Sequence, residues 1–276
     1  MKQKDKQSEI EFHKADDWEA GQASPSRAAV PVEQPVELRV DDRHLVTLFC
    51  TPGHLEELAT GFLLGQGFVS AADDIAAISV DGELKRVDVE LRSPLALGNA
   101  PARRTVIYSG CGQGPLQVAD AAAGPEKPLI GTGGGPVPET AKLPSAAALR
   151  EALSKTLRRG NVYRATRGVH SAAICSPKGS VMALREDVGR HNALDKALGW
   201  AAGRCLDPGR VFVAASGRVS SEAVDKLVRF GIMVMVAKGV PTSLALGKAD
   251  EMGVTVAGSI GPARLRIYTH SERIAP

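Results

Sequence analysis

Two stretches of the chain place an arginine beside a glycine, where an apolar strand pattern gives way to a helix pattern. The first, Arg185–Gly199, reads R-E-D-V-G-R-H-N-A-L-D-K-A-L-G and contains Arg190 and His191. The second, Ser216–Ile232, begins S-G-R-V-S-S-E. Ligands of open α/β sheets bind where strands end and helices begin, because helix N-termini offer free N–H groups and a positive dipole end. The two turns therefore predict a site for an anionic, phosphate-bearing ligand.

The turn Ser216-Gly217-Arg218, followed by Ser220-Ser221-Glu222, has the residue types of a phosphate cradle. Glycine permits a close backbone approach, serine can cap a helix, and arginine is a forked donor. A capped helix with a surface arginine would use the same residues. We favour the ligand site because two such turns occur in one predicted sheet. Neither turn matches G-x-G-x-x-G or a P-loop, so the ordinary dinucleotide and NTP motifs are absent.

His191 stands at the N-terminus of a predicted helix, where the helix dipole disfavours an imidazolium. We predict a neutral hydrogen-bonding or proton-transfer role for it. The alternative is that His191 or Asn192 only caps the helix. Asp195 and Lys196, in the first turns of the same helix, are interpreted as solvated surface charges. His170 begins an apolar strand pattern and is interpreted as a structural residue.

Cys111 lies in the loop S-G-C-G-Q-G, directly after the strand pattern Thr105–Tyr108. Glycines on both sides leave the sulfur uncrowded. A thiol becomes a nucleophile as the thiolate, which requires a nearby positive charge or helix N-terminus. We favour a reactive thiol over the alternative, a turn whose cysteine packs inward. The remaining cysteines lie in or beside apolar elements and are predicted to be buried: Cys50, Cys175 and Cys205.

The 276-residue composition, 43% apolar and 24% charged, is that of a soluble globular protein with ample material for a core. A net charge of +3 and only 4% aromatic residues argue against nucleic acid as a partner. No window approaches the roughly 20 apolar residues of a membrane helix, and no apolar signal-peptide core follows the charged N-terminus. We expect a cytoplasmic protein with free thiols and no membrane contact.

Period-two and helical patterns predict the elements that position these residues. The predicted strands are Val36–Val40, Leu45–Phe49, Arg86–Leu91, Thr105–Tyr108, Val181–Leu184, Val211–Ala215, Met233–Val236, Val254–Ala257 and Leu265–Tyr268. The predicted helices begin after Thr51-Pro52-Gly53 and at Leu149–Leu157, Asn192–Ala202, Ser221–Phe230 and Thr242–Met252. The alternation of strands and helices in the second half predicts a layered α/β sheet with short right-handed connections.

The predicted organisation has four parts. Residues 1–34 are polar and are expected to be a disordered leader. Residues 35–123 form a smaller N-terminal α+β domain that carries the Cys111 loop. Residues 124–145 are rich in glycine and proline and are expected to be a mobile loop. Residues 146–276 form the C-terminal α/β domain, which binds the cofactor.

The whole ordered part of the chain resembles the FdhD family, the formate dehydrogenase accessory sulfurtransferases. The Glu186–Gly199 and Ser216–Gly231 blocks are long matches, and they follow each other along the chain in the same order as in that family. The other matching blocks are Glu33–Val40, Thr51–Leu63, Thr166–Ala173, Pro241–Ala245 and Ile267–Thr269.

This resemblance implies a homodimeric protein whose C-terminal domain is similar to the cytidine-deaminase fold. It implies that a cysteine desulfurase donates sulfur, which Cys111 carries as a persulfide. The sulfur then passes to the bound substrate, Mo-bis(molybdopterin guanine dinucleotide), so that formate dehydrogenase becomes active; no metal or stable prosthetic group is expected. The family's cofactor-binding segment corresponds to Ser259–Arg264. With the two turns, the expected cofactor-binding residues are Ser259, Ile260, Gly261, Pro262, Ala263, Arg264, Arg190, His191, Ser216, Gly217 and Arg218.

The chain departs from the family pattern in three places. The family loop usually reads C-G-x-C-G, but Gly114 replaces the second cysteine, so that loop has no relaying thiol. Arg167 stands where the family more often has glycine, and Gly261-Pro262 replace residues that are often basic. The missing thiol motivates an alternative function, a non-catalytic chaperone that binds the molybdenum cofactor for formate dehydrogenase. A zinc deaminase is disfavoured because the P-C-x-x-C motif that supplies its cysteine ligands is absent.

Overall fold

Alternating apolar residues build the first of two large sheets in this computed structural model, which describes residues 8–93, 106–107, 144–261 and 264–275. Every second residue of β3 (Gln34–Val40) is buried. β3 pairs antiparallel with β4 (Arg43–Cys50) across a tight turn at Asp41-Asp42. The sheet order is β5-β6-β3-β4-β7. Its other strands are β5 (Ile75–Asp81), β6 (Arg86–Leu91) and β7 (Val106–Ile107).

The second sheet has six strands in the order β13-β12-β11-β10-β8-β9. They are β8 (His170–Cys175), β9 (Val181–Asp187), β10 (Phe212–Ala215), β11 (Val234–Ala237), β12 (Thr255–Gly261) and β13 (Arg264–Ile267). β10, β11 and β12 are parallel, whereas β8 and β13 run the other way. β9 is antiparallel to β8 and therefore follows the direction of β10. The carboxyl ends of β9 to β12 and the starts of β8 and β13 thus share one edge, which we call the carboxyl edge.

Helices cover both faces of the second sheet. On one face, α2 packs against the side chains of Phe212 and Ala214. On the other face, α4, α5 and α6 pack against Val213 and Ala215, because successive residues of a strand point to opposite faces. The helices are α1 (Leu55–Gln66), α2 (Ala146–Arg159), α3 (Asn161–Thr166), α4 (Arg190–Ala202), α5 (Ser221–Arg229) and α6 (Ser243–Glu251). Three short 3-10 turns lie at Ala72–Asp74, Pro208–Arg210 and Ser271–Arg273.

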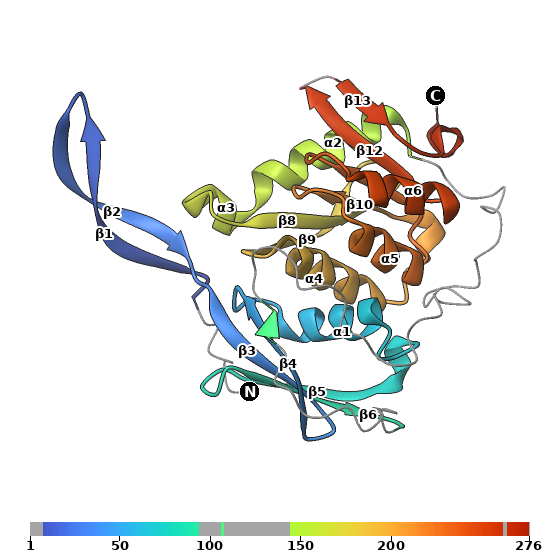
Figure 1. Cartoon of the computed structure of the whole chain (residues 1–276), viewed down its shortest axis with the longest axis horizontal. Helices are drawn as coiled ribbons and strands as arrows, with labels where there is room; N and C mark the ends of the chain where they lie inside the picture. Colours follow the sequence, from blue (N-terminus) through green and yellow to red (C-terminus); the bar gives the residue numbers. More distant parts are fainter. Residues whose placement is uncertain (1–7, 94–105, 108–143, 262–263, 276) are drawn as a thin grey trace.

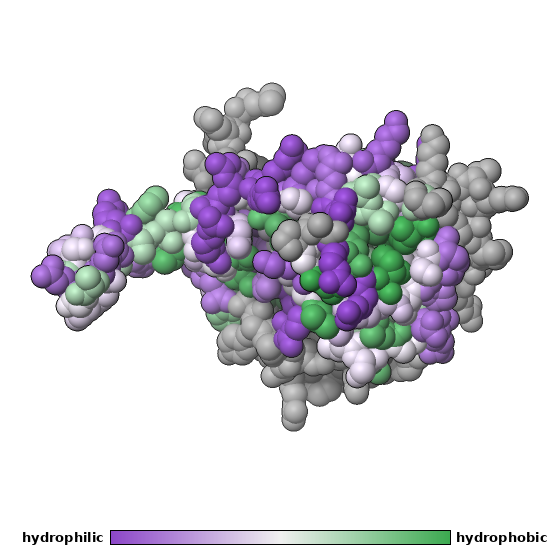
Figure 2. Space-filling model, turned by 90° about the horizontal axis from the view of Figure 1, so that it is seen from above, coloured by the Kyte–Doolittle hydropathy of each residue, from purple (hydrophilic) through white to green (hydrophobic). Residues whose placement is uncertain are grey.

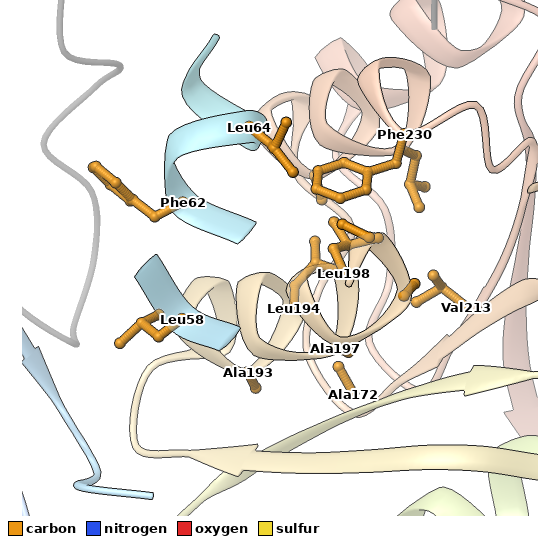
Figure 3. Close-up of a cluster of buried hydrophobic side chains, with 14 of the residues drawn as sticks. Leu58, Phe62, Leu64, Ala172, Ala193, Leu194, Ala197, Leu198, Val213 and Phe230 are labelled. Carbon is orange, nitrogen blue, oxygen red and sulfur yellow. The ribbon is translucent and has the colours of Figure 1, made fainter. Parts of the chain in front are cut away.

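α1 joins the two halves of the chain, because it lies between the first sheet and α4 (Figure 1). Leu64 of α1 points toward Leu198 and Phe230, whereas Leu58 and Phe62 of the same cluster point to the other side of α1 (Figure 3). Two glycines permit the close approach of α1 and α4. A Cβ on Gly61 would overlap the carbonyl of Asp195, and a Cβ on Gly199 would overlap the carbonyl of Glu57. One hydrophobic cluster therefore extends through both predicted domains.

The expected disordered leader is wrong over residues 10–31. β1 (Ile10–Glu19) and β2 (Gln22–Pro31) form a ten-pair antiparallel hairpin that extends away from the body (Figures 1 and 2). Ala20 and Gly21 connect the strands, and both have positive φ. That conformation is the type I′ turn, whose twist matches paired strands. A polar composition can therefore still form a local hairpin, and the A-G turn was the signal in the sequence.

The predicted strands and helices of the second half are confirmed to within a few residues. β5 and α3 were not predicted as elements, and β8 agrees with the apolar strand pattern that begins at His170. The fold is mixed α/β, and the likeness to the cytidine-deaminase fold stays a prediction. The loop expected at 124–145 lies outside the described residues except for Pro144 and Ser145. Among the described residues, no helix has the length and apolar character needed to cross a membrane.

Candidate functional site

The carboxyl edge brings the two Gly-Arg turns together. Ser216 follows β10, and its hydroxyl accepts the backbone N–H of Ser171 at 2.9 Å. Nδ1 of His170 lies 3.2 Å from the same hydroxyl. From the other turn, Arg190 lies so close that a Cβ on Gly217 would be 3.0 Å from the Arg190 Cβ. The turns therefore form one site, and His170, predicted to be only structural, belongs to it.

A small pocket marks this meeting point. Its polar lining comes from both turns and from the start of β8, and its floor is apolar. The residues that line it are His170, Ser171, Arg190, His191, Leu194, Ala215, Gly217, Arg218, Ala223 and Met235. Four of the predicted binding residues, Arg190, His191, Gly217 and Arg218, therefore line one pocket.

Several features make the carboxyl edge electropositive. α4, α5 and α6 all begin there, so three positive helix ends face the same side. The N-cap residue of α4 is Gly189, which has no side chain to satisfy the first N–H groups of the helix. Nε of Arg190 is buried and has no hydrogen-bond partner within the described part of the chain. Arg218 is exposed. These groups fit a phosphate, which accepts from both N–H groups and guanidinium.

His191 is held between two side chains of the α5 end. Its Nε2 lies 3.1 Å from the Ser220 hydroxyl, and its Nδ1 lies 3.5 Å from a carboxylate oxygen of Glu222. Burial lowers the pKa of His191 to about 4, and this outweighs the opposing effect of Glu222. Burial and Arg190 also lower the pKa of His170. Both imidazoles are therefore neutral at physiological pH, as the sequence predicts for His191.

Asp195 and Lys196 are not surface charges, which corrects the sequence interpretation. Both are buried, because α1 covers the face of α4 that a two-layer arrangement would leave in water. Lys196 Nζ lies 2.7 Å from Asp187 and donates to the carbonyl of Thr51 at 2.8 Å. The hint in the sequence was Gly199, whose missing side chain lets a second helix pack closely on α4.

A second buried ion cluster lies under His191. Lys226 Nζ lies 2.8 Å from Asp195 and 3.0 Å from Glu222. Gln66 of α1 also donates to Glu222, at 3.2 Å. Burial raises the pKa of Asp195 to about 6 although Lys226 opposes this. The cluster therefore links the pocket to the helix layer beneath it.

The described residues of this segment, Ser259–Gly261 and Arg264, lie at the same edge but outside the pocket. Ser259–Gly261 end β12 and Arg264 begins β13, where the two strands pair beyond the last β11 pairing at Gly258. Ser259 donates to the carbonyl of Gly261 at 3.2 Å, and Ile260 and Arg264 are exposed. Pro262 and Ala263 lie outside the described residues. β12 is two strands away from β10, so this segment and Ser216 are not in contact through the sheet.

Cys111 lies outside the described residues, but the strand that precedes it does not. Ile107 of β7 pairs in parallel with Leu48 of β4. β4 leads to Thr51, whose N–H donates to Asp187 at 3.0 Å. The described chain before Cys111 therefore runs toward the end of β9, which is part of the carboxyl edge.

The other thiols differ in accessibility. Cys50 and Cys175 are buried, as predicted, and burial raises the pKa of both, to about 12 for Cys175. Cys205 is exposed, so its predicted burial is wrong. It follows the end of α4 with a positive φ, so the chain turns outward there. Cys50 and Cys175 therefore stay protonated, whereas Cys205 is open to reagents.

Most of this chain matches one protein-family model. The family model FdhD/NarQ matches residues 31–275. The chain belongs to the FdhD/NarQ family. The match includes both Gly-Arg turns and the whole carboxyl edge, and it begins at the last residue of the hairpin.

Relatives of this FdhD/NarQ chain include two proteins named sulfur carrier protein FdhD. The one from Geobacillus kaustophilus is 34% identical over 249 residues, which cover 89% of each chain. The one from Bacillus subtilis is 32% identical over 93% of this chain and 94% of the relative. A crystal structure of a protein assigned as a formate dehydrogenase accessory protein, from Desulfotalea psychrophila, has a TM-score of 0.74 at 24% identity. It covers 97% of this chain and all of that one, and it supports the fold.

Arg167 occupies a position whose backbone conformation favours glycine. It caps α3 with φ +58°, in the left-handed region, and its N–H donates to the carbonyl of Tyr163 at 2.8 Å. Glycine adopts this cap without strain, whereas another residue loses roughly 1–2 kcal/mol. Here the guanidinium lies 5.2 Å from the centre of the Tyr163 ring, an attraction that offsets part of that cost.

Proposed function

We propose that this protein is a sulfur carrier, and in enzymatic terms a sulfurtransferase. It receives persulfide sulfur from a cysteine desulfurase on Cys111 and passes it to Mo-bis(molybdopterin guanine dinucleotide), so that formate dehydrogenase becomes active. Family membership over residues 31–275, with relatives named sulfur carrier protein, carries the proposal. A cytoplasmic location and a homodimer, both implied by the family resemblance, belong to the same proposal.

The loading step is a thiolate–persulfide exchange. The Cys111 thiolate attacks the outer sulfur of the desulfurase persulfide, and a new S–S bond forms as the donor's S–S bond breaks. The donor cysteine leaves as a thiolate, so the exchange needs no oxidant or reductant. Cys111 follows Ile107 by four residues, a span of at most about 14 Å. This reach, from a strand that runs toward the end of β9, supports delivery at the carboxyl edge.

The carboxyl edge fits the anionic cargo. A guanosine diphosphate arm would find the start of α4, the unpartnered Nε of Arg190 and the exposed Arg218 in one place. Ser259–Arg264 lie two strands further along the same edge, a separation of roughly 10 Å. An extended dinucleotide can bridge that separation. These residues bind and orient the cargo, while the sulfur chemistry belongs to Cys111.

Intact mass spectrometry tests the loading step. The purified protein is incubated with a cysteine desulfurase and cysteine, and its mass is measured with and without reductant. We expect a reducible gain of about 32 Da, one sulfur atom, that Cys111→Ala abolishes. Cys205→Ala is the matched control, because Cys205 is an exposed thiol away from the site. A gain that persists in Cys111→Ala but disappears in Cys205→Ala would refute Cys111 as the carrier.

GDP binding separates the proposal from its alternative, a chaperone that binds the cofactor without moving sulfur. We expect Arg190→Ala and Arg218→Ala each to weaken GDP binding by about tenfold or more, which corresponds to one lost charged hydrogen bond. If these variants also lose function while Cys111→Ala restores full formate dehydrogenase activity in a deletion strain, the protein is the chaperone. If both variants bind GDP normally, the proposed phosphate site is wrong.

A further inference from the structure

The β1–β2 hairpin is an arm with little support from the rest of the protein. Its base is closed by the N–H of Val32, which donates to the carbonyl of Glu9 at 3.0 Å, and α3 packs beside that base. The remainder projects from the body (Figures 1 and 2). Two aromatic side chains on it are largely exposed, Phe12 at 62% and Trp18 at 74%.

Such an arm needs a partner. A single two-stranded hairpin is marginally stable in water, and exposed aromatic side chains cost free energy that burial would recover. Within the described part of the chain, β1 pairs only with β2. The question is therefore which edge of the hairpin is open for pairing, and to what.

The two edges of the hairpin are not equivalent. β2 contains Pro25 and Pro31, which have no N–H to donate and therefore occupy positions whose nitrogen faces away from β1. The outer edge of β2 thus lacks two donors. β1 contains no proline. Its outer edge is consequently the one that can accept another strand.

The prolines also fix which groups of β1 face outward. Pro25 lies opposite Asp16, and Pro31 lies opposite Ile10. These are non-hydrogen-bonded pairs of the ladder, because the proline nitrogens face outward. By alternation, Ile10, Phe12, Lys14, Asp16 and Trp18 direct their own N–H and C=O groups to the open edge. An added strand must match these residues.

We propose that β1 pairs antiparallel with β1 of a second copy of this chain, centred on Ala15. In this register Lys14 lies opposite Asp16, and Phe12 lies opposite Trp18. His13 lies opposite Asp17 on the other face. Every one of these pairs occurs twice because the arrangement is two-fold symmetric. Opposite charges and aromatic pairs across strands each stabilise a sheet.

Charge selects this register over its neighbours. In an antiparallel pairing, a residue whose N–H and C=O groups face the open edge must lie opposite another such residue. The two-fold axis can therefore shift only from one residue to the next, and never to a point between two residues. Moving it to Lys14 sets Lys14 against its own copy, and moving it to Asp16 sets two Asp16 carboxylates together. In the register centred on Ala15, the only like-charged pair is Glu11 with Glu19. It lies at the ends of the ladder, where water screens it.

The result is a four-stranded sheet, β2-β1-β1-β2, that crosses the two-fold axis. Each Phe12 meets the Trp18 of the other copy, so one aromatic pair lies near each end of the ladder, on the face that also carries Ala23 and Ala29 of β2, and the Lys14–Asp16 pairs lie between them. The proline-bearing edges of β2 face outward and end the sheet. This contact specifies the homodimer proposed above and does not rest on sulfur transfer, so either idea can fail alone.

A charge-reversal cycle tests the contact on the full-length chain by sedimentation velocity over a concentration series. We expect Lys14→Glu to weaken dimerisation by about tenfold, because two favourable cross-strand pairs become repulsive. The double variant Lys14→Glu/Asp16→Lys restores opposite charges and should restore the dimer. Lys178→Glu is the matched control, since it makes the same charge change at an exposed residue in the turn between β8 and β9, outside the arm. It should leave dimerisation unchanged.

Cross-linking tests the register itself. Ala15 meets its own copy at a non-hydrogen-bonded pair, where Cα atoms lie about 4.5 Å apart. Under mild oxidation Ala15→Cys should form a covalent dimer, whereas Ala28→Cys on β2 should not exceed the background of the natural chain, which has the exposed Cys205. A monomeric natural chain would overturn the proposal. So would a dimer that Lys14→Glu leaves intact and Ala15→Cys does not cross-link, because the arm would then serve another partner.

Discussion

At the scale of single residues, the site is organised by buried carboxylates that each serve several donors. Asp187 accepts from the N–H groups of Thr51 and Gly189 and from Asn192, besides Lys196. The turn before α4 is therefore held by a side chain of the preceding strand, whereas the first N–H groups of α4 receive no side-chain cap. This arrangement positions Arg190, whose Nε has no hydrogen-bond partner among the residues that the structure describes.

Removing the Asp187 carboxylate should be strongly destabilising. Asp187→Ala leaves Lys196 as an unpaired buried cation, and we expect a loss of about 3–5 kcal/mol in the free energy of unfolding. Urea denaturation of the full chain measures it. Glu151→Gln is the control, because the Glu151–Lys155 pair lies at the surface and should change little. Equal stability of the two variants would contradict the structural role of Asp187.

His191 should make the protein sensitive to acid. Its pKa is about 4 in the folded chain and 6.5 in the unfolded chain, so between these values only the unfolded chain binds the proton. Stability is therefore lost as the pH falls from 6.5 toward 4, and His191 alone contributes about 3 kcal/mol to that loss. His191→Gln should show a smaller loss over that range in thermal unfolding. A parallel pH profile for both proteins would show that His191 is not held neutral.

At the scale of elements, the carboxyl edge depends on turns that pack against one another. Gly239 follows β11, and a Cβ there would lie 2.6 Å from both the Arg218 nitrogen and the Gly217 carbonyl oxygen. Both are backbone atoms, so the neighbouring turn must move to make room. The geometry of the pocket at the two Gly-Arg turns is thus set by a glycine that does not line it.

Gly239→Ala should therefore weaken GDP binding by about tenfold through displacement of the Gly217-Arg218 turn. Isothermal titration calorimetry measures the affinity. Gly247→Ala is the control, because no atom lies within 4 Å of its Cβ position in the interior of α6. This control should keep normal binding and gain about 0.5–1 kcal/mol in stability. Normal GDP affinity in Gly239→Ala would show that the turn does not bind the ligand.

At the scale of the whole molecule, α1 makes the two halves of the chain one cooperative unit. It contributes Leu58, Phe62 and Leu64 to the cluster that also contains residues of the second sheet (Figure 3). The second sheet thus supports a helix from the N-terminal half, and that helix in turn buries the charges of α4. We expect both halves to unfold together.

Gly199→Ala tests this coupling. Its Cβ would overlap the Glu57 carbonyl of α1, so the helices must separate, and we expect a loss of about 3 kcal/mol or more. Gly203→Ala at the end of the same helix is the control, because its nearest atom is 3.6 Å away. Circular dichroism in urea should show one transition for the natural chain. Two separate transitions there would contradict a shared core.

Local sequence patterns were sufficient to predict much of the secondary structure of this protein. Periods of two and of about 3.6 residues located β3, β4 and the alternating elements from β9 to β13, because such patterns depend on neighbours in sequence. The Gly-Arg turns were recognised for the same reason, since a strand end and a helix start lie next to each other in the chain. The hairpin arm was missed because its apolar residues are few, although its turn residues were present.

Only the tertiary structure decided which residues of those elements are buried, which form ion pairs and which line the pocket. Asp195 and Lys196 look like surface charges in the sequence, but α1, more than 120 residues earlier, covers them. His170 joins the pocket only because β8 lies beside β10 in the sheet. A pattern in one segment records which of its faces are apolar, and it holds no information on which distant segment packs there. Burial, ion pairing and the lowered pKa of His191 therefore follow from the assembled layers.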